Sequence, residues 1–189
     1  NIIQQRTNCH LRPLTKKIIR EEDYAHKLFD VINECYKDLY NFTVLPKNMA
    51  DQYIGFYLSI LDLKYVSIVE NEKNEIVAFG ITMPSIARAL QKSRGKLFPF
   101  GWWPLLKSLF LKREEGVEML LVGVRPDYQG TGLNSLVMVD MFKKFTAAGM
   151  VWAETNAILE TNVKNQRQFA DFEKDCKKRR RSYIKKLEY

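Results

Sequence analysis

Apolar residues in the first third of the chain recur with the period of amphipathic helices. From Glu21 to Tyr40 they return every third or fourth position, the spacing of a helix face that packs on a core. We expect this helix to pack rather than to catalyse. A second helix is predicted over Asn48 to Leu61, because Pro46 leads into it and Asn48 is a suitable N-cap.

The pattern changes to short apolar runs after the second helix. Tyr65 to Glu70 and Ile76 to Met83 are rich in β-branched residues, and the polar sequence NEKNE separates them. This spacing predicts two antiparallel strands joined by a turn, with Pro84 closing the second. A short helix is predicted from Ser85 to Arg94.

The next segment, GKLFPFGWWPLLKSLFLKRE, is crowded with aromatic residues. Two prolines and Lys107 exclude a membrane span. It is predicted to cover the core, to form a lid over an apolar substrate, or to be an interfacial helix, and covering the core is the favoured interpretation. The aromatic residues are Phe98, Phe100, Trp102, Trp103 and Phe110.

A phosphate cradle is predicted after the aromatic segment. Glu118 to Val124 has the composition of a buried strand, which Arg125 and Pro126 end. Gly130 and Gly132 then let the backbone turn its N–H groups toward one point as a helix begins, and the positive end of the helix dipole attracts an anion. The helix is indicated by apolar residues at helical spacing, with Gly149 as its C-terminal stop: Leu133, Leu136, Val137, Met141, Phe145 and Ala148.

Spacing distinguishes the known phosphate loops. A P-loop requires lysine and then serine or threonine after its last glycine, but Leu133 and Asn134 follow Gly132. A dinucleotide fingerprint requires a third small residue and a first glycine close behind the strand. Here five residues separate Val124 from Gly130, so that interpretation is weak, although Glu154 lies near where a ribose-binding acid is expected.

The sequence VRPDYQGTGLN resembles motif A of the GCN5-related N-acetyltransferases. The matching residues are Gln129, Gly130, Thr131, Gly132 and Leu133, whereas Asn134 stands where the family usually has glycine or alanine. Asparagine tolerates left-handed conformations, so the loop is expected to form. The resemblance implies that these residues bind the pyrophosphate of acetyl-CoA. The alternative is a strand–turn–helix connection that merely contains two glycines.

The remaining elements complete an α/β fold. MVWAETNA is a predicted strand, NVKNQRQFADFEKD a helix and RRSYIKKLEY a final strand, with a further short strand near residues 9–14. This order suits one domain with a mixed sheet flanked by helices, as the resemblance implies, plus the aromatic insertion. Because the first residue is Asn1 rather than methionine, an N-terminal portion is expected to precede this chain.

Acetyl transfer requires a polarised carbonyl and a deprotonated amine. The resemblance implies that backbone N–H groups near Val122 and Val124 polarise the carbonyl. Gly123 between them marks either a bulge that frees those groups or the close approach of a neighbouring side chain. Glu118 and Glu154 are the candidate bases, since apolar surroundings raise the pKa of a carboxylate; Glu154 is favoured, and a salt-bridged or edge role is the alternative for each.

The family often protonates the leaving thiolate with a tyrosine after the fifth strand. If Asn165 anchors the alignment, Phe172 stands at that position, and phenylalanine has no proton to give. Tyr183, a water molecule or no acid then serves instead. Asn162 is the other candidate anchor, as a helix-starting residue that contacts the coenzyme arm, and the sequence does not choose between the two.

Composition and charge narrow the function further. The chain has 189 residues, 46% of them apolar, enough for one core, and the three cysteines Cys9, Cys35 and Cys176 lack the spacing of a metal site. Without a signal peptide or an apolar span, a reducing cytoplasmic location is expected. Of the net charge of +8, residues 174–189 carry +6. The cluster at residues 177–181 is best interpreted as a solvated edge; an anchor for acidic groups on a ligand is the alternative, and the small footprint disfavours nucleic acid.

Together these features predict an acetyl-CoA-dependent N-acetyltransferase. It is expected to move an acyl group to an amine of a small molecule or peptide by direct attack in a ternary complex, and no residue names the acceptor, the acyl length or the oligomeric state. An inactive CoA-binding sensor or scaffold is the alternative that Asn134 and Phe172 favour. An NAD-binding oxidoreductase is disfavoured by the absent third glycine.

Overall fold

The computed structural model describes residues 2–21, 23–40, 42–44, 46–108 and 115–185. Two compact units divide the chain, Asn1–Glu154 and Thr155–Tyr189, and each is described by itself below. Among the described helices, none combines the length and the apolar character that crossing a bilayer requires.

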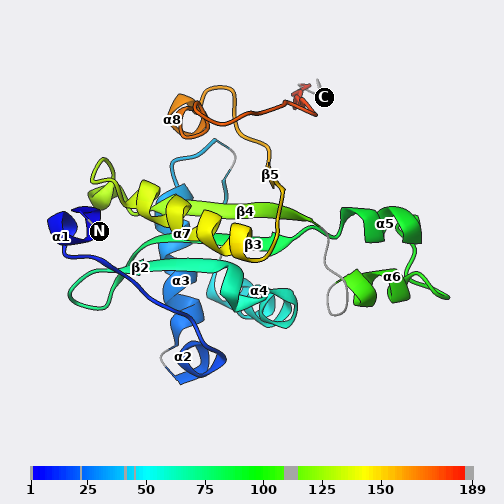
Figure 1. The fold of residues 1–189 in the computed structure, drawn as a ribbon, viewed down its shortest axis with the longest axis horizontal. Coiled ribbons are helices and arrows are strands. Elements are labelled where there is room, and N and C mark those ends of the chain that lie inside the picture. The colour runs from blue at the N-terminus through cyan, green and yellow to red at the C-terminus, as the bar shows by residue number, and fades with distance from the viewer. Residues whose placement is uncertain (1, 22, 41, 45, 109–114, 186–189) are drawn as a thin grey trace, which may run out of the picture. The chain divides into compact units, whose positions relative to one another are not determined.

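A five-stranded sheet forms the centre of the first unit, in the order β1-β2-β3-β4-β5 (Figure 1). The first four strands pair antiparallel with their neighbours. The predicted hairpin is therefore confirmed, as are short strands near residues 9–14 and within MVWAETNA. The strands are β1 His10–Leu11, β2 Val66–Glu70, β3 Ile76–Pro84, β4 Gly116–Val124 and β5 Trp152–Thr155.

The helices agree with the periodicity, with corrections at their ends. The predicted helix over residues 21–40 is interrupted, since Asp23 has a left-handed φ of 51° directly before α3. Pro46 rather than Asn48 is the N-cap of α4. The helices of the first unit are α1 Ile2–Thr7, α2 Lys16–Glu21, α3 Tyr24–Tyr36, α4 Lys47–Ile60, α5 Ala87–Ser93, α6 Trp102–Leu106 and α7 Leu133–Ala147, with 3-10 turns η1 Leu63–Tyr65 and η3 Pro126–Tyr128.

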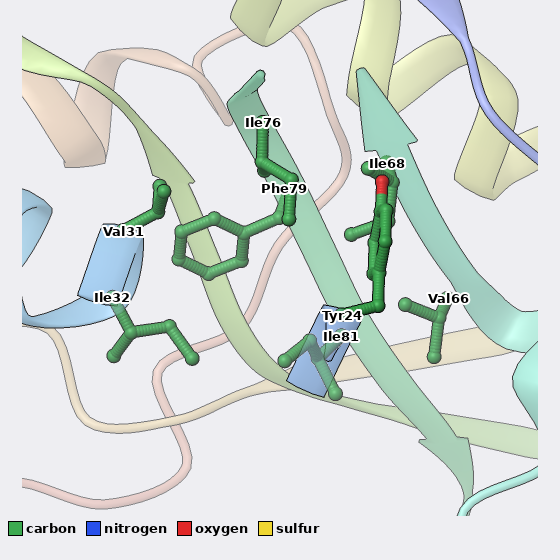
Figure 2. Packing of buried hydrophobic residues seen from close by; sticks show 8 residues of the cluster. All are labelled: Tyr24, Val31, Ile32, Val66, Ile68, Ile76, Phe79 and Ile81. Atoms are coloured by element: carbon green, nitrogen blue, oxygen red, sulfur yellow. The ribbon is translucent and has the colours of Figure 1, made fainter. Parts of the chain in front are cut away.

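One face of the sheet packs against α3. Phe79 on β3 is fully buried, and Val31 and Ile32 of α3 lie in the same cluster (Figure 2). Burial of a side chain of this size contributes about 1.5–3 kcal/mol relative to its exposed state. The cluster comprises Tyr24, Val31, Ile32, Val66, Ile68, Ile76, Phe79 and Ile81.

The opposite face packs against α7. Neighbouring residues of a strand point to opposite faces, so Gly80 faces α7 where Phe79 faces α3. A Cβ at Gly80 would lie 2.4 Å from the Met141 sulfur and 2.8 Å from Val137, which shows how closely helix and strand approach. The absence of a side chain at Gly80 thus sets the height of α7 above the sheet. Figure 1 shows α3 and α7 on the two sides of the sheet.

The segment from Ala87 to Ser108, called the aromatic arm below, contains α5 and α6. The two helices pack mainly against each other, beyond the end of the sheet (Figure 1). Phe98, Phe100, Trp102 and Trp103 are all exposed. The favoured expectation that these aromatics cover the core is therefore wrong for the described residues, because α5 and α6 pack mainly against each other and leave these rings exposed; Phe110 lies outside the described residues.

The second unit is less regular than the sequence predicts. Its helix, α8, spans only Val163–Arg167, and turns follow up to residue 172. Residues 180–185 form no strand. The predicted long helix and final strand are thus wrong for the described residues. The basic cluster at 177–181 is exposed, as expected of a solvated edge.

Candidate functional site

The turn that leaves β4 is held by a charged network around Arg125. Its guanidinium donates to both Asp127 oxygens, at 3.0 and 2.5 Å, and its charged head lies 5.4 Å from the centre of the Tyr128 ring. The hydrogen bond from Arg125 holds the pKa of the Asp127 carboxyl below its usual value. Glu34 and Glu75 lie 4.0 and 3.7 Å from the same guanidinium. Charge-assisted bonds of this kind fix the direction in which the chain enters the glycine loop.

Both loop glycines adopt the conformation that the sequence predicts. Gly130 and Gly132 have φ of 81° and 93°, in the left-handed region that L side chains rarely adopt. Asn134 does not: it lies inside α7 with helical geometry, so its tolerance of left-handed backbone is irrelevant here. The side chain of Ile3 in α1 lies 3.4 Å from the position that a Cβ on Gly132 would take.

The start of α7 presents free backbone donors. The first bond that closes the helix runs from the Leu136 N–H to the Gly132 carbonyl, at 3.2 Å. Within the described part of the chain, the N–H groups of Leu133, Asn134 and Ser135 donate to no backbone acceptor. With fifteen residues in the helix, the partial positive charge of its N-terminus is added to these donors. The loop therefore has the geometry of an anion cradle.

The alternation of hydrogen-bonded and non-bonded pairs between β3 and β4 identifies which backbone N–H and C=O groups of β4 point away from β3. Arg125 donates its N–H to the Val77 carbonyl at 2.9 Å, and Phe79 pairs with Gly123 two residues earlier on β4. In an antiparallel ladder the bonded pairs alternate with non-bonded ones. The N–H and C=O groups of Val122 and Val124 consequently point away from β3, toward the other edge of β4. This is the orientation that the predicted role in carbonyl polarisation requires.

Tyr36 already contacts that edge, and sequence reasoning missed it. Its hydroxyl donates to the Val122 carbonyl at 2.8 Å and accepts from the Val122 N–H at 3.1 Å. Burial raises the pKa of Tyr36 to about 12, so the phenol is neutral at physiological pH. The helical period of residues 21–40 places Tyr36 on a packing face and carries no signal of this contact. The structure brings it together with Val122 across 86 positions of sequence.

Of the two alternatives for Gly123, the structure favours the close approach of a neighbouring side chain over a bulge. A Cβ at Gly123 would lie 2.7 Å from the Phe79 ring, so glycine lets that ring occupy the core. The irregularity in the ladder lies earlier, where Ile81 pairs with Leu121 but Thr82 pairs with Met119. Leu120 is thus the extra residue. The bulge precedes Val122 by two positions and bends β4 before the edge groups described above.

The two candidate bases lie on β4 and β5, which are neighbouring strands. Glu118 is half-buried and accepts a hydrogen bond from the Ser85 hydroxyl at 3.0 Å. Glu154 is exposed, so the apolar surroundings expected for it are absent. The Val151 N–H donates to the Glu115 carbonyl at 2.8 Å, which fixes the start of β5 beside the start of β4. Glu118 is therefore the carboxylate with a defined local environment.

The remaining predicted residues belong to the second unit. Asn162 starts α8, and its side chain accepts from the Asn165 N–H at 3.2 Å, so it is the helix-starting residue and Asn165 lies within the helix. Phe172 is exposed, with its ring 6.4 Å from that of Phe169. Tyr183 is also exposed. Their roles toward a coenzyme stay predictions.

Comparison with known proteins gives two curated sequence relatives. A bacterial ceramide synthase of Caulobacter vibrioides is 27% identical over 112 residues, covering 58% of this chain and 28% of the relative. Protein YghO of Escherichia coli is 26% identical over 211 aligned positions, covering 97% of this chain and 52% of the relative. The chain thus spans about half or less of the length of these relatives. No protein-family profile matches the sequence.

Solved structures resemble the chain over most of its length. PH1933 from Pyrococcus horikoshii has a TM-score of 0.57 at 14% identity, with 87% of each chain covered. Diaminobutyrate acetyltransferase EctA from Paenibacillus lautus, solved with its substrate and coenzyme A, has 0.54 at 13%, covering 88% of this chain and 75% of its own. A GCN5-related N-acetyltransferase from Sphaerobacter thermophilus has 0.54 at 11%, covering 82% and 37%. Together with the sheet order and the glycine loop, these likenesses show that the chain has the GCN5-related N-acetyltransferase fold.

Proposed function

We propose that this protein is a CoA-dependent N-acyltransferase. The observation that carries the proposal is the free row of N–H groups at the start of α7, placed directly after a strand whose far edge exposes backbone groups. The coenzyme pyrophosphate would accept hydrogen bonds from the loop between Gln129 and Asn134. The pantetheine arm would pair with the β4 edge at Val122 and Val124.

The Tyr36 hydroxyl occupies one of the proposed coenzyme contacts. Because it bonds both backbone groups of Val122, pantetheine pairing at that residue requires the hydroxyl to give up at least one bond. A displaced phenol would lie beside the thioester, where its O–H is a donor for the carbonyl oxygen. Tyr36→Phe removes this competition and this donor together. It is expected to bind coenzyme more tightly and to turn over more slowly, a split that titration and steady-state kinetics measure separately.

The reaction follows from the groups on the two strands. The acceptor amine transfers a proton to Glu118 or Glu154, directly or through water, and its nitrogen attacks the thioester carbonyl. The tetrahedral oxyanion is stabilised by N–H donors of the β4 edge. Collapse breaks the carbon–sulfur bond, giving an amide and the coenzyme thiolate. With Asn165 as the anchor of the resemblance, Phe172 has no proton for this leaving group, and Tyr183 or water would supply it.

For the acceptor, one of the two relatives favours an amine with a long apolar portion. A ceramide is the amide of a long-chain amino alcohol, so a ceramide synthase performs N-acylation, and the Caulobacter protein of that name matches 58% of this chain. The exposed aromatic arm agrees with an apolar substrate. A long-chain acyl-CoA and a lipid-like amine are therefore the first substrates to assay. Acetylation of polar polyamines alone would contradict this part of the proposal.

Calorimetric titration tests the coenzyme, with acetyl-CoA, palmitoyl-CoA, NADH and ATP as ligands. Gly132→Glu places a carboxylate at the anion cradle and is expected to reduce CoA affinity by at least about tenfold. Gly149→Glu is the matched control, because Gly149 has φ of 72° at the opposite end of α7 and nothing near its Cβ position. Circular dichroism establishes that both variants are folded. An equal loss of CoA affinity in both variants, or no loss in either, would contradict the proposal that the glycine loop binds the coenzyme.

The second candidate is a CoA-binding sensor without turnover. It is favoured by Asn134 at the start of α7 and by Phe172, which replaces an acid of the resembling family. Such a protein would bind acetyl-CoA in the same titration. Thiol release from acyl-CoA in the presence of an amine panel distinguishes the two, since only an enzyme releases coenzyme A faster than the buffer does.

A further inference from the structure

The aromatic arm displays a dense run of exposed apolar side chains, since six of the ten residues from Leu97 to Leu106 are large, apolar and exposed. Phe98, Phe100 and Trp103 are 82%, 76% and 56% exposed. Monomeric proteins rarely leave such a group of large apolar residues in water unless it contacts something. The exposed apolar residues of the arm are Leu90, Leu97, Phe98, Phe100, Trp102, Trp103 and Leu106.

The same segment is uniformly basic. Between Ala87 and Ser108 the sequence has five lysines and arginines and no acid. Lys92, Arg94, Lys96 and Lys107 are exposed, and no ion pair within the described part of the chain involves them. Positive charge beside exposed aromatics is the composition of elements that lie in a membrane interface. Protein–protein interfaces instead deplete lysine at their apolar centres.

Local hydrogen bonds make the arm suited to a less polar environment. Backbone N–H groups of Lys96, Trp102 and Trp103 donate to carbonyls within the arm, at 2.9, 3.1 and 3.2 Å. The Trp102 indole N–H donates to the Pro99 carbonyl at 3.0 Å. Groups that already have partners cost less to remove from water. The Trp102 ring can thus be covered without leaving its indole donor unpaired.

We propose that the aromatic arm docks this protein on the surface of a lipid bilayer that contains anionic headgroups. Phe98, Phe100 and Trp103 enter the boundary between headgroups and acyl chains, and the lysines and arginines contact the lipid phosphates. The arm follows β3 and precedes β4 in the chain, so docking brings the bilayer to the end of the sheet where Pro84 pairs with Val117, one position before the candidate base Glu118. Membrane binding is independent of acyl transfer and is measured without coenzyme.

Co-sedimentation with vesicles tests the proposal, using phosphatidylcholine alone and phosphatidylcholine with enough phosphatidylglycerol to give a surface potential of about −30 mV. Binding is expected to the anionic vesicles and to weaken with salt. Tryptophan emission gives a second readout: in a Trp152→Phe background, Trp102 and Trp103 are the tryptophans that report, and a blue shift with quenching by brominated lipid is expected.

Two pairs of variants assign the binding to the arm. Phe98→Ser/Phe100→Ser/Trp103→Ser is expected to lower the partition coefficient at least about tenfold, whereas Tyr40→Ser/Tyr53→Ser/Phe56→Ser, at exposed aromatics elsewhere, leaves it unchanged. Lys92→Glu/Lys96→Glu is expected to lower it by about fivefold or more for each residue. Lys178→Glu/Lys185→Glu in the basic C-terminal run is the matched charge control.

Several results would overturn the proposal. Absence of vesicle binding by the wild-type chain, or binding that only the C-terminal charge variant abolishes, would remove the arm from any membrane role. Sedimentation velocity tests the other occupant: a dimer that dissociates in the Phe98/Phe100/Trp103 variant, without vesicle binding, would assign the arm to a second copy. If the protein does not bind CoA in the titration, these experiments still test membrane docking, because none of them uses coenzyme.

Discussion

The β2–β3 hairpin and the aromatic arm are both rich in large apolar residues, and the structure uses them in opposite ways. Every residue of β2 is buried and so are all but the last of β3, whereas the arm exposes most of its aromatics. The hairpin lies between α3 and α7, while α5 and α6 pack mainly against each other. Apolar content alone therefore does not decide burial; a neighbouring layer does.

The largest expected effect on stability comes from removing an aromatic ring from the hairpin, and the same deletion in the aromatic arm is its comparison. Phe79→Ala leaves a cavity between β3 and α3 and is expected to lower the free energy of unfolding by about 3–5 kcal/mol. Phe98→Ala removes the same atoms from an exposed position and is expected to change it by less than about 0.5 kcal/mol. Urea unfolding measures both. Similar losses in the two variants would show that the arm is packed in solution.

Adding a methyl group at Gly123 tests how closely β4 packs against the core beside the proposed site. Gly123→Ala brings a Cβ to 2.7 Å from the fully buried Phe79 ring, and a loss of about 1–3 kcal/mol in the free energy of unfolding is expected. Phe79→Leu in the same background is expected to recover part of that loss, because the smaller side chain gives room. A stable Gly123→Ala variant would contradict the close-packing role assigned to this glycine.

Alkaline pH distinguishes a thiol near the core from one at the surface. Burial raises the pKa of Cys35 to about 12, from an ordinary value near 9.0, whereas Cys176 is exposed. The unfolded chain therefore releases this proton at lower pH than the folded one, so stability is retained below about pH 9 and lost between pH 9 and 12. From pH 8 to 10.5 a loss of about 1 kcal/mol is expected, allowing for partial exposure.

Urea midpoints of the wild type and Cys35→Ala at the two pH values isolate this contribution, since all other groups titrate in both proteins. The variant is expected to lose less stability. Alkylation at pH 8 gives an independent check, with Cys176 modified rapidly and Cys35 slowly. Parallel pH profiles in the two proteins would contradict the assigned burial.

The smallest expected effect is a gain in stability. Gly55 lies inside α4, with nothing within 4 Å of its Cβ position. Gly55→Ala is therefore expected to raise the free energy of unfolding by about 0.5–1 kcal/mol, because alanine loses less backbone entropy in a helix. Thermal unfolding detects the shift. A loss of stability would contradict the open surroundings assigned to the Gly55 Cβ position.

Local patterns predicted much of the fold because their causes are local. The β2–β3 hairpin follows from two β-branched runs and a polar turn, and the end of α7 at Gly149 follows from its left-handed φ. The glycine loop was predicted for the same reason, since Gly130 and Gly132 act through their own backbone freedom. Prediction failed beyond residue 160, where helical spacing in NVKNQRQFADFEKD is satisfied by one short helix and turns.

The sequence by itself thus determined the strand, the glycine turn and the helix that form the proposed anion cradle, because neighbouring residues specify each of them. Only the tertiary structure decided that Tyr36 bonds Val122, that Phe79 fills the space beside Gly123, and that the aromatic arm is exposed. These contacts depend on which layers cover the sheet and which side chains meet across it. Such long-range packing is a property of the assembled layers, and periodicity along one segment carries no record of it.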